Sequence, residues 1–383
     1  YHQKSRLCRE VFSKLLGRIV KVFLPFALVK VRKNQNKSYL CTSKTKIQMK
    51  RLLFFVSAVL FATFLYSQER LLTMKIVYEV PIMQGRIASS ETKDSIVYDY
   101  LVDKRFWWQT IDRVNALAKN KKLFFTTFKG DSIVYDSIMS SLTLALNKQY
   151  GKTHTPQEVQ KIIEEQIRAV RFEEQWHYDE NNMLIAKRVL AFNPVIIRDT
   201  IAFEQDELKI KPLFRYELGW VRPRGEVIYK DTVVVARNIE FTIPIYNSQP
   251  YHWWDSHLEA EYSVPFLESL IDKAENGHIK VYEAPSSSEE FIKPEILKRK
   301  QFDVLETLVS TDQYGNVSER DTVIKSSYTS DNIDHFRFGE EWYFDKENLN
   351  FIKNTNYFAP MVSIFGKQGD FRGLYPLYYI RRR

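Results

Sequence analysis

One motif occurs twice in the chain, and this internal repeat constrains the fold more than any other feature. The first copy begins Phe172-Glu-Glu-Gln-Trp-His-Tyr-Asp179, and the second begins Phe338-Gly-Glu-Glu-Trp-Tyr-Phe-Asp345. The copies align without a gap at an offset of 166 residues (172 to 338). Phe, Glu, Trp, Asp, Asn, Lys, Phe and Pro are identical at positions 172, 174, 176, 179, 182, 187, 192 and 194 of the first copy. Self-similarity of this kind indicates a duplicated unit, so we expect two related modules.

Each copy has the pattern of a β-hairpin. Residues 174–178 alternate in the manner of a strand, residues 179–182 supply turn residues, and residues 183–190 return as a second strand. We expect the Asp of each copy to serve the turn through hydrogen bonds, and the Glu to face solvent.

The remaining sequence predicts helices between short strands. Apolar spacing or a helix-start signal marks four segments: Trp108–Lys121, Ser137–Leu146, Glu158–Val170 and Val264–Asn276. The hexapeptide Asp94-Ser-Ile-Val-Tyr-Asp99 recurs unchanged at Asp131–Asp136, and we interpret both as the start of a strand.

The predicted fold class is α+β, with two related modules that each have helices followed by an antiparallel sheet. We place the first module at residues 68–222, a strand-rich connection at 223–249 and the second module at 250–383. Trp253-Trp254, just after the connection, echo Trp107-Trp108 of the first module.

The N-terminal segment predicts export. Met49-Lys-Arg51 precedes an apolar run from Leu52 to Tyr66, which is the pattern of a signal peptide at residues 49–67. The run is short for a membrane span, although an uncleaved anchor is the alternative reading. We expect residues 1–48 to be a non-native upstream extension and exclude them from the fold.

The net charge of +9 does not indicate a nucleic-acid partner, because it lies in the N-terminal segment. Residues 1–67 hold 14 Lys and Arg against a single acid, Glu10, whereas residues 68–383 hold 42 Lys and Arg against 46 Asp and Glu. The mildly acidic part that folds lacks the basic surface that phosphate binding requires. Both cysteines, Cys8 and Cys41, also precede residue 68, which excludes thiol catalysis and Cys-ligated zinc in the modules.

No set of residues predicts catalysis, a metal or a cofactor. His252 and His257 are five residues apart, which does not match the spacing of a helical zinc pair. The acids of the repeat, Glu174 with Asp179 and Glu340 with Asp345, flank predicted turns, and we favour a structural role over acid–base chemistry.

The abundance of aromatic residues favours assembly, because Trp and Tyr are enriched at interfaces. The candidate structural or interface residues are Trp107, Trp108, Trp176, Asp179, Pro194, Trp253, Trp254, Trp342, Asp345 and Pro360. Duplicated modules with strand edges suit a homo-oligomer. The alternative is an exported carbohydrate-binding module or hydrolase that uses the paired tryptophans.

The second copy, Phe338 to Lys346 and on to Ala359-Pro360, resembles the Glu-Glu-Trp-Phe-Phe-Asp-Lys motif of the GldN/PorN family. Three further segments resemble parts of that family: Lys104–Asp112, Phe266–Glu283 and Leu374–Ile380. The family pattern carries one such signature, whereas this chain carries two, so we interpret the chain as a divergent or duplicated member.

The resemblance implies a non-enzymatic structural subunit of the type IX secretion and gliding-motility machinery of Bacteroidota. It implies a periplasmic location at the inner face of the outer membrane. The partners it implies are an outer-membrane lipoprotein ring component (GldK/PorK-like) and a periplasmic motor or translocon protein (GldM/PorM-like).

Overall fold

A computed structural model describes most of the chain after residue 68. The described residues are 69–89, 94–204, 207–225, 232–246, 258–311, 317–366 and 369–382. Residues Gln68–Arg383 form one compact unit. The predicted signal peptide, the upstream extension, and the residues Trp253, Trp254, His252 and His257 lie outside the described residues.

The first antiparallel sheet contains four strands in the order β1-β6-β7-β8. Their bounds are Glu69–Pro81 (β1), Ile167–Asp179 (β6), Ile185–Glu204 (β7) and Glu207–Glu217 (β8). The first copy of the repeated motif forms the β6–β7 hairpin, as the alternation predicted.

The second antiparallel sheet has the order β14-β13-β12-β9, and the short β15 also pairs with β13. The bounds are Thr232–Pro244 (β9), Ile333–Asp345 (β12), Asn350–Phe365 (β13), Phe371–Pro376 (β14) and Ile380–Arg381 (β15). The second copy of the motif forms the β12–β13 hairpin. The edge strand β9 lies within residues 223–249, which we predicted to be a strand-rich connection.

The two sheets are built in the same order, which defines a first half (residues 69–225) and a second half (residues 232–382). Each half runs strand, helix, hairpin, final strand: β1, α3 (Lys104–Lys119), β6, β7, β8, and then β9, α6 (Ala260–Glu275), β12, β13, β14. The α+β class is confirmed. The arrangement of helices followed by a sheet is not confirmed, because β1 and β9 precede the helices and pair with the first strand of each hairpin.

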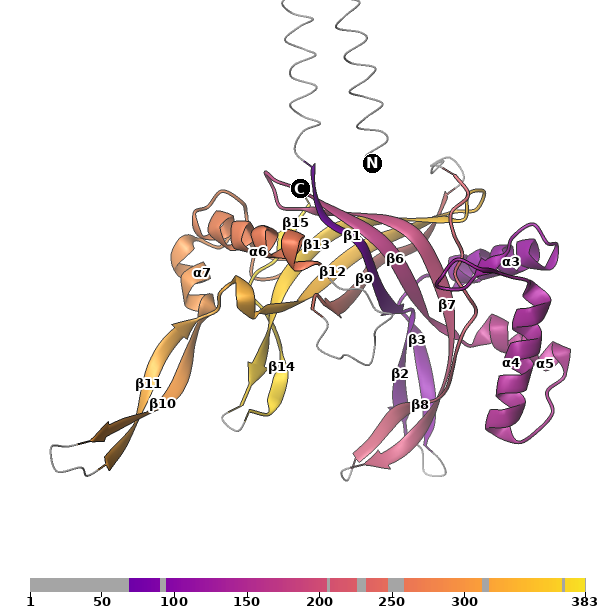
Figure 1. The fold of residues 1–383 in the computed structure, drawn as a ribbon, viewed down its shortest axis with the longest axis horizontal. Helices are drawn as coiled ribbons and strands as arrows, with labels where there is room; N and C mark the ends of the chain where they lie inside the picture. Colours follow the sequence, from indigo (N-terminus) through magenta and orange to yellow (C-terminus); the bar gives the residue numbers. More distant parts are fainter. Residues whose placement is uncertain are drawn as a thin grey trace, which may run out of the picture. The chain divides into compact units, whose positions relative to one another are not determined.

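The helices lie in two groups (Figure 1). The helices α3, α4 (Tyr135–Tyr150) and α5 (Pro156–Glu165) contact one another, and α6 contacts α7 (Lys293–Lys300). The α5 helix begins with a capping box: Glu158 N–H donates to Thr155 Oγ1 (3.2 Å), and Thr155 N–H donates to the Glu158 carboxylate (2.7 Å).

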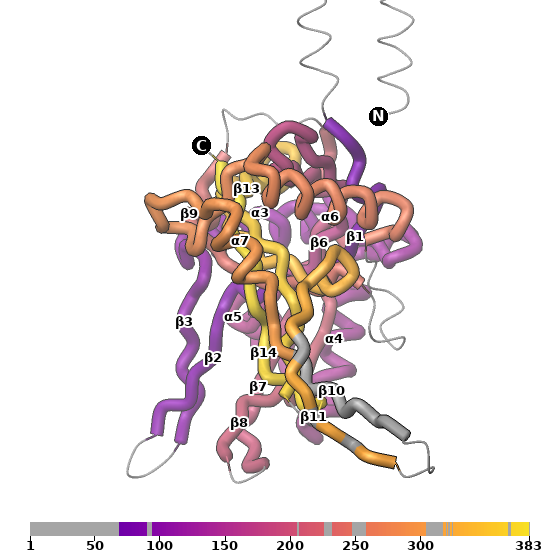
Figure 2. The backbone as a smooth tube through the Cα atoms, turned by 90° about the vertical axis from the view of Figure 1, so that its left-hand side faces the viewer, coloured from indigo at the N-terminus to yellow at the C-terminus, as the bar shows by residue number. Residues whose placement is uncertain are grey.

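Further strands form small two-stranded sheets, two of which extend as separate hairpins (Figure 2). These are β2 (Met83–Ala88) with β3 (Ser95–Tyr100), β4 (Phe125–Thr126) with β5 (Ser132–Ile133), and β10 (Gln301–Thr311) with β11 (Val317–Ser327). One 3-10 turn, Ser330–Asn332, precedes β12.

The two identical hexapeptides adopt different structures. The first forms strand β3, as predicted, whereas the second gives only the two-residue β5 before α4 begins at Tyr135. Tyr135 is 7% exposed because it packs into the core from the first turn of that helix. The interpretation of Asp131–Asp136 as the start of a strand therefore holds only for Ser132–Ile133, since tertiary packing overrides local preference beyond them.

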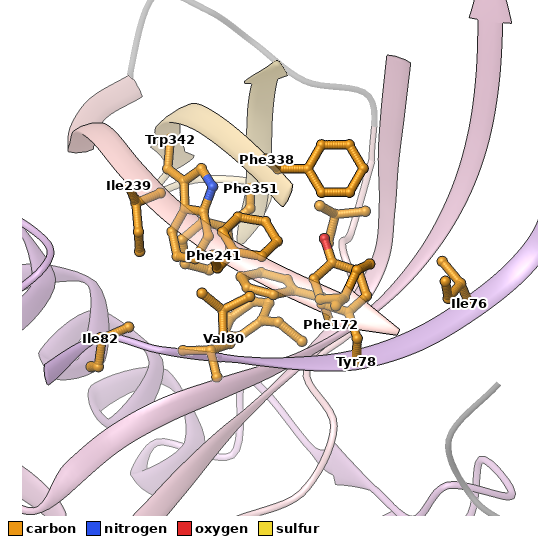
Figure 3. Close-up of a cluster of buried hydrophobic side chains, with 14 of the residues drawn as sticks. Ile76, Tyr78, Val80, Ile82, Phe172, Ile239, Phe241, Phe338, Trp342 and Phe351 are labelled. Atoms are coloured by element: carbon orange, nitrogen blue, oxygen red, sulfur yellow. The ribbon is translucent and has the colours of Figure 1, made fainter. Parts of the chain in front are cut away.

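Aromatic side chains from both sheets form one core (Figure 3). Phe172 of β6 lies edge-on to Phe351 of β13, with ring centroids 5.4 Å apart. Phe241 of β9 lies 5.8 Å from Phe338 of β12. Burial of such large side chains is the main favourable term in joining the two halves.

Candidate functional site

The turn of the first hairpin explains why Asp179 and Asn182 are retained in both copies of the motif. Asp179 Oδ1 accepts a hydrogen bond from the backbone N–H of Asn181 (2.8 Å), and Asp179 Oδ2 accepts one from Asn182 Nδ2 (3.0 Å). Met183 follows with φ of 58°. A left-handed residue after an Asp-stabilised turn returns the chain into β7.

The turn of the second hairpin repeats this arrangement. Asp345 Oδ1 accepts from the backbone N–H groups of Glu347 (2.9 Å) and Asn348 (3.1 Å), and Oδ2 accepts from Asn348 Nδ2 (3.0 Å). Leu349 occupies the left-handed position with φ of 52°. The prediction that both Asp residues serve the turns is confirmed.

Pro194 and Pro360 lie where one edge of each long strand changes its pairing partner, from Val221 to β8 in the first half and from β15 to β14 in the second. Pro194 O accepts from Leu218 N–H (3.1 Å), and Pro360 O accepts from Leu377 N–H (3.0 Å). Pairing with the final strand begins at the next residue of each long strand. Because Pro lacks an N–H group, it suits a position where one ladder of hydrogen bonds gives way to another.

Four charged residues of the repeat meet in the core, and we call Glu174, Lys187, Glu340 and Lys353 the tetrad. Lys187 Nζ lies 2.5 Å from Glu340 Oε1, and Lys353 Nζ lies 2.8 Å from Glu174 Oε1. All four side chains are 0% exposed. Each hairpin thus supplies the lysine that neutralises the other hairpin's glutamate, and the buried group has no net charge.

The tryptophan of each motif holds the glutamate of its own half. Trp176 Nε1 donates to Glu174 Oε2 (2.7 Å), and Trp342 Nε1 donates to Glu340 Oε2 (2.8 Å). A buried carboxylate needs such partners, since each unsatisfied acceptor costs about 1–3 kcal/mol. The spacing Glu-x-Trp places both side chains on one face of the strand, so the motif builds its own acceptor–donor pair.

The phenylalanine of each motif lies beneath the lysine of the other half. Lys187 Nζ is 3.1 Å from the ring centroid of Phe338, and Lys353 Nζ is 3.1 Å from that of Phe172. The rings also meet in matched pairs: Trp176 lies 5.2 Å from Phe338, and Trp342 lies 5.1 Å from Phe172, both edge-on. Cation–π attraction supports a desolvated ammonium in such a position.

Tyr78 breaks the symmetry of the tetrad. Tyr78 OH donates to Glu174 Oε2 (2.7 Å) and accepts from Lys353 Nζ (3.2 Å). Phe241 holds the equivalent position in the second half, because Tyr78 pairs with Phe172 and Phe241 pairs with Phe338. The two rings stack at 5.8 Å (Figure 3). Among the residues that the structure describes, Glu174 therefore has a hydroxyl partner that Glu340 lacks.

Burial and the opposite charges act against each other on the tetrad. Burial lowers the pKa of Lys187 to about 8, although Glu340 and Glu174 oppose the change. Burial likewise lowers the pKa of Lys353. Burial disfavours the charged form of Glu174, but Lys353 and Lys187 outweigh it and hold the pKa of that carboxyl below its usual value. Burial, together with Glu174, raises the pKa of Tyr78.

The expectation that the glutamates of the motif face solvent was wrong. Glu174 and Glu340 are each 0% exposed, because the opposing lysine and the neighbouring tryptophan compensate their burial. The lysine partners were missed as functional residues, although the identity of residues 187 and 353 between the copies was the available signal.

Of the predicted tryptophans in the described part of the chain, two lie at the tetrad and two lie elsewhere. Trp176 and Trp342 lie at the tetrad. Trp107 of α3 is buried in the core, with 2% of its surface exposed, and Trp108 on the same helix is partly buried. A sugar-binding platform needs an accessible ring, so burial of Trp107 does not favour the alternative of a carbohydrate groove. Within the described ranges, no group of three or more His, Cys, Asp or Glu side chains is placed to hold a metal.

No helix in the described part of the chain combines the length and the apolar character needed to cross a membrane. In comparisons with known proteins, no curated protein and no solved structure matched this chain significantly.

Residues 223–381 match the family model of the gliding motility associated protein GldN. The matched segment contains every strand of the second sheet, from β9 to β15, and hence the second copy of the motif with Glu340 and Lys353. The GldN family is a component of gliding motility and type IX secretion and is not a known enzyme family. The match over this segment supports a GldN/PorN-like family member.

Proposed function

We propose that this chain is a non-enzymatic structural subunit of a periplasmic type IX secretion and gliding-motility assembly. The match of residues 223–381 to the GldN family carries this proposal. The buried tetrad supports it, because the most distinctive residues of the motif are committed to holding two sheets together.

Residues 68–222 form the first GldN-like module in this proposal. The support is the equivalent order of elements in the two halves, together with the matched turns at Asp179 and Asp345. The bulge in each hairpin also falls at the same place, between Glu173 and Glu174 in the first and between Gly339 and Glu340 in the second. Independent sequences converge poorly on such details, so a duplication explains them best.

The proposed location is the periplasm, at the inner face of the outer membrane, after export by the signal peptide at residues 49–67. The proposed partners are an outer-membrane lipoprotein of the GldK/PorK kind, a motor or translocon protein of the GldM/PorM kind, and neighbouring copies of the subunit. The family match and the sequence pattern of the N-terminal segment support these assignments.

Exposed aromatic side chains support binding to neighbouring subunits. Phe203 at the β7 end is 69% exposed, and Phe365 and Phe371 at the β13–β14 end are 60% and 59% exposed. These positions are the final hairpins of the two halves, so each half presents aromatic area at the same place. Large exposed aromatic side chains are typical anchors of protein interfaces.

Affinity purification from native envelopes tests the proposal. A tagged chain is expected to co-purify with an outer-membrane lipoprotein and with envelope proteins of the secretion machinery. The matched control is the variant K187E, which places two carboxylates together in the core and should lose this capture through misfolding. Recovery of the folded wild-type chain alone, from envelopes in which the machinery is assembled, would contradict the proposed role.

A further inference from the structure

The ion pairs and the lysine–phenylalanine contacts that join the two halves at the tetrad are reciprocal. In the tetrad, residues 174 and 187 of the first half bind residues 353 and 340 of the second, and the offset of 166 exchanges the two ion pairs. A contact in which position i binds position j while j binds i is the mark of a two-fold interface between identical subunits. The core of this chain therefore has the organisation of a homodimer interface.

The hairpin turns repeat this exchange outside the core. Lys273 of α6 donates to the backbone carbonyl of Glu180, in the turn of the first half. Arg113 of α3 donates to the backbone carbonyl of Lys346, in the turn of the second half, at 3.4 Å. Lys346 Nζ in turn donates to Gln109 of α3 (3.1 Å). Each turn is thus held by the helix of the opposite half.

The chain passes between the halves once, between Glu217 at the end of β8 and Thr232 at the start of β9. The ion pairs and ring contacts of the tetrad all join side chains, and none requires that the two halves belong to the same chain. The covalent connection raises the effective concentration of one half around the other, on the order of millimolar for a short linker. It does not change how the surfaces of the two halves fit together.

We propose that the interface between the halves also forms between chains, so that the first half of one copy binds the second half of another. The partner is a second copy of this chain, because its second half carries the Glu340 and Lys353 that complement Lys187 and Glu174. Reciprocal exchange closes a dimer in which both tetrads are complete. This inference goes beyond the role proposed above, and it stands whether or not the lipoprotein binds.

Charge reversal in separate chains tests the exchange. In K187E a carboxylate faces Glu340, and in E340K an ammonium faces Lys187, so neither variant can pair its own halves without like-charge repulsion. In a mixture, the first half of the K187E chain can bind the second half of the E340K chain, so that the introduced carboxylate pairs with the introduced ammonium. The first half of the E340K chain then binds the second half of the K187E chain, and this interface keeps the wild-type residues at positions 187 and 340. The two variants are refolded separately and together, and mass is measured by size exclusion with light scattering.

The mixture is expected to yield a 1:1 heterodimer of twice the monomer mass, with a thermal midpoint above that of either variant alone. The matched control is the double variant K187E/E340K in one chain, which restores opposite charges internally and is expected to fold as a monomer. A folded double variant together with a mixture that gives no heterodimer overturns the proposal.

A second measurement decides the matter if the reversed pair does not fold. A protease site placed between Gly225 and Thr232 of the otherwise wild-type chain is cleaved after folding, and the nicked protein is unfolded and refolded. Recovery of a 1:1 complex of the two fragments supports pairing without a covalent connection. Fragments that separate after cleavage, or that fail to reassociate, overturn it, and neither result depends on the capture of envelope partners.

Discussion

The Lys187 ammonium lies 2.5 Å from Glu340 Oε1, and both side chains are fully buried although they are 153 residues apart in the chain (187 to 340). The equivalent pair, Lys353 with Glu174, crosses the same core in the opposite sense. A buried ion pair gives little net stability compared with apolar residues of similar volume. An arrangement of the halves that left one of these charges buried without its partner would, however, be strongly destabilised. The tetrad therefore specifies how the two halves dock.

Removal of one charge from the tetrad is expected to be costly. The variant K187M should lower the free energy of unfolding by about 3–5 kcal/mol, because Glu340 is left buried without its cation. The double variant K187M/E340L removes both charges and should recover a large part of that loss. Urea denaturation of the two variants and the wild type measures the effect, and equal losses in both variants would contradict the proposed origin.

The pKa of Lys187 predicts a pH-dependent stability. The group titrates at about 8 in the folded protein and at its ordinary value of 10.5 when unfolded, so the unfolded chain binds more protons between these values. The contribution of Lys187 to the free energy of unfolding is therefore expected to rise between pH 8 and about 10. Urea titrations across this window check it, and K187M should lack the contribution.

The hydroxyl of Tyr78 is expected to matter for Glu174. In Y78F the carboxylate loses a buried hydrogen bond of 2.7 Å, and the free energy of unfolding should fall by about 1–3 kcal/mol. The matched control is Phe241→Tyr, which adds a hydroxyl at the equivalent position, where Glu340 has no such partner. Thermal denaturation of the two variants compares the sites, and a neutral Y78F would show that the hydroxyl contributes nothing.

The two turn aspartates should differ in their effect on stability. Asp345 is 0% exposed and accepts from three groups, so D345A is expected to cost about 1–3 kcal/mol. Asp179 is only partly buried, and D179A should cost closer to about 1 kcal/mol. Chemical denaturation measures both losses, and the reverse order would show that burial does not set the cost.

Exposed aromatic residues at the end of the second half are expected to act in assembly. The double variant F365S/F371S should retain wild-type thermal stability, because both side chains are more than half exposed. It should nevertheless reduce co-purification of envelope partners severalfold, since exposed aromatic area anchors interfaces. The control is V323S, another exposed apolar residue, on the separate β10–β11 hairpin, which should leave capture unchanged.

One cross-strand pair differs between the two copies of the motif: Gly339 faces Tyr357 in the second hairpin, whereas Glu173 faces Ala191 in the first. A Cβ atom at Gly339 would lie 2.0 Å from the Tyr357 ring, so this position requires glycine. The equivalent positions in the first half are Glu173 and Ala191, where a large residue faces a small one in the opposite order. Sequence alignment identifies both pairs, but only the register of the strands shows that they are neighbours.

The sequence by itself determined the hairpins and their turns. Alternation over Glu174–Tyr178, the Asp and Asn of each turn, and the capping residues Thr155 and Glu158 all act through near neighbours, so local chemistry suffices to predict them. The repeat also identified the family, and the residues 223–381 confirm that assignment. These features depend on contacts within a few residues along the chain.

Only the tertiary structure decided what the repeated charges do. Glu174 and Lys353 are 179 residues apart in the chain (174 to 353), and no local pattern shows that one neutralises the other. The same limit explains why one copy of Asp-Ser-Ile-Val-Tyr-Asp forms β3 while the other leads into α4. Burial depends on which surfaces meet, and that is set by the docking of the halves rather than by the residues of either one.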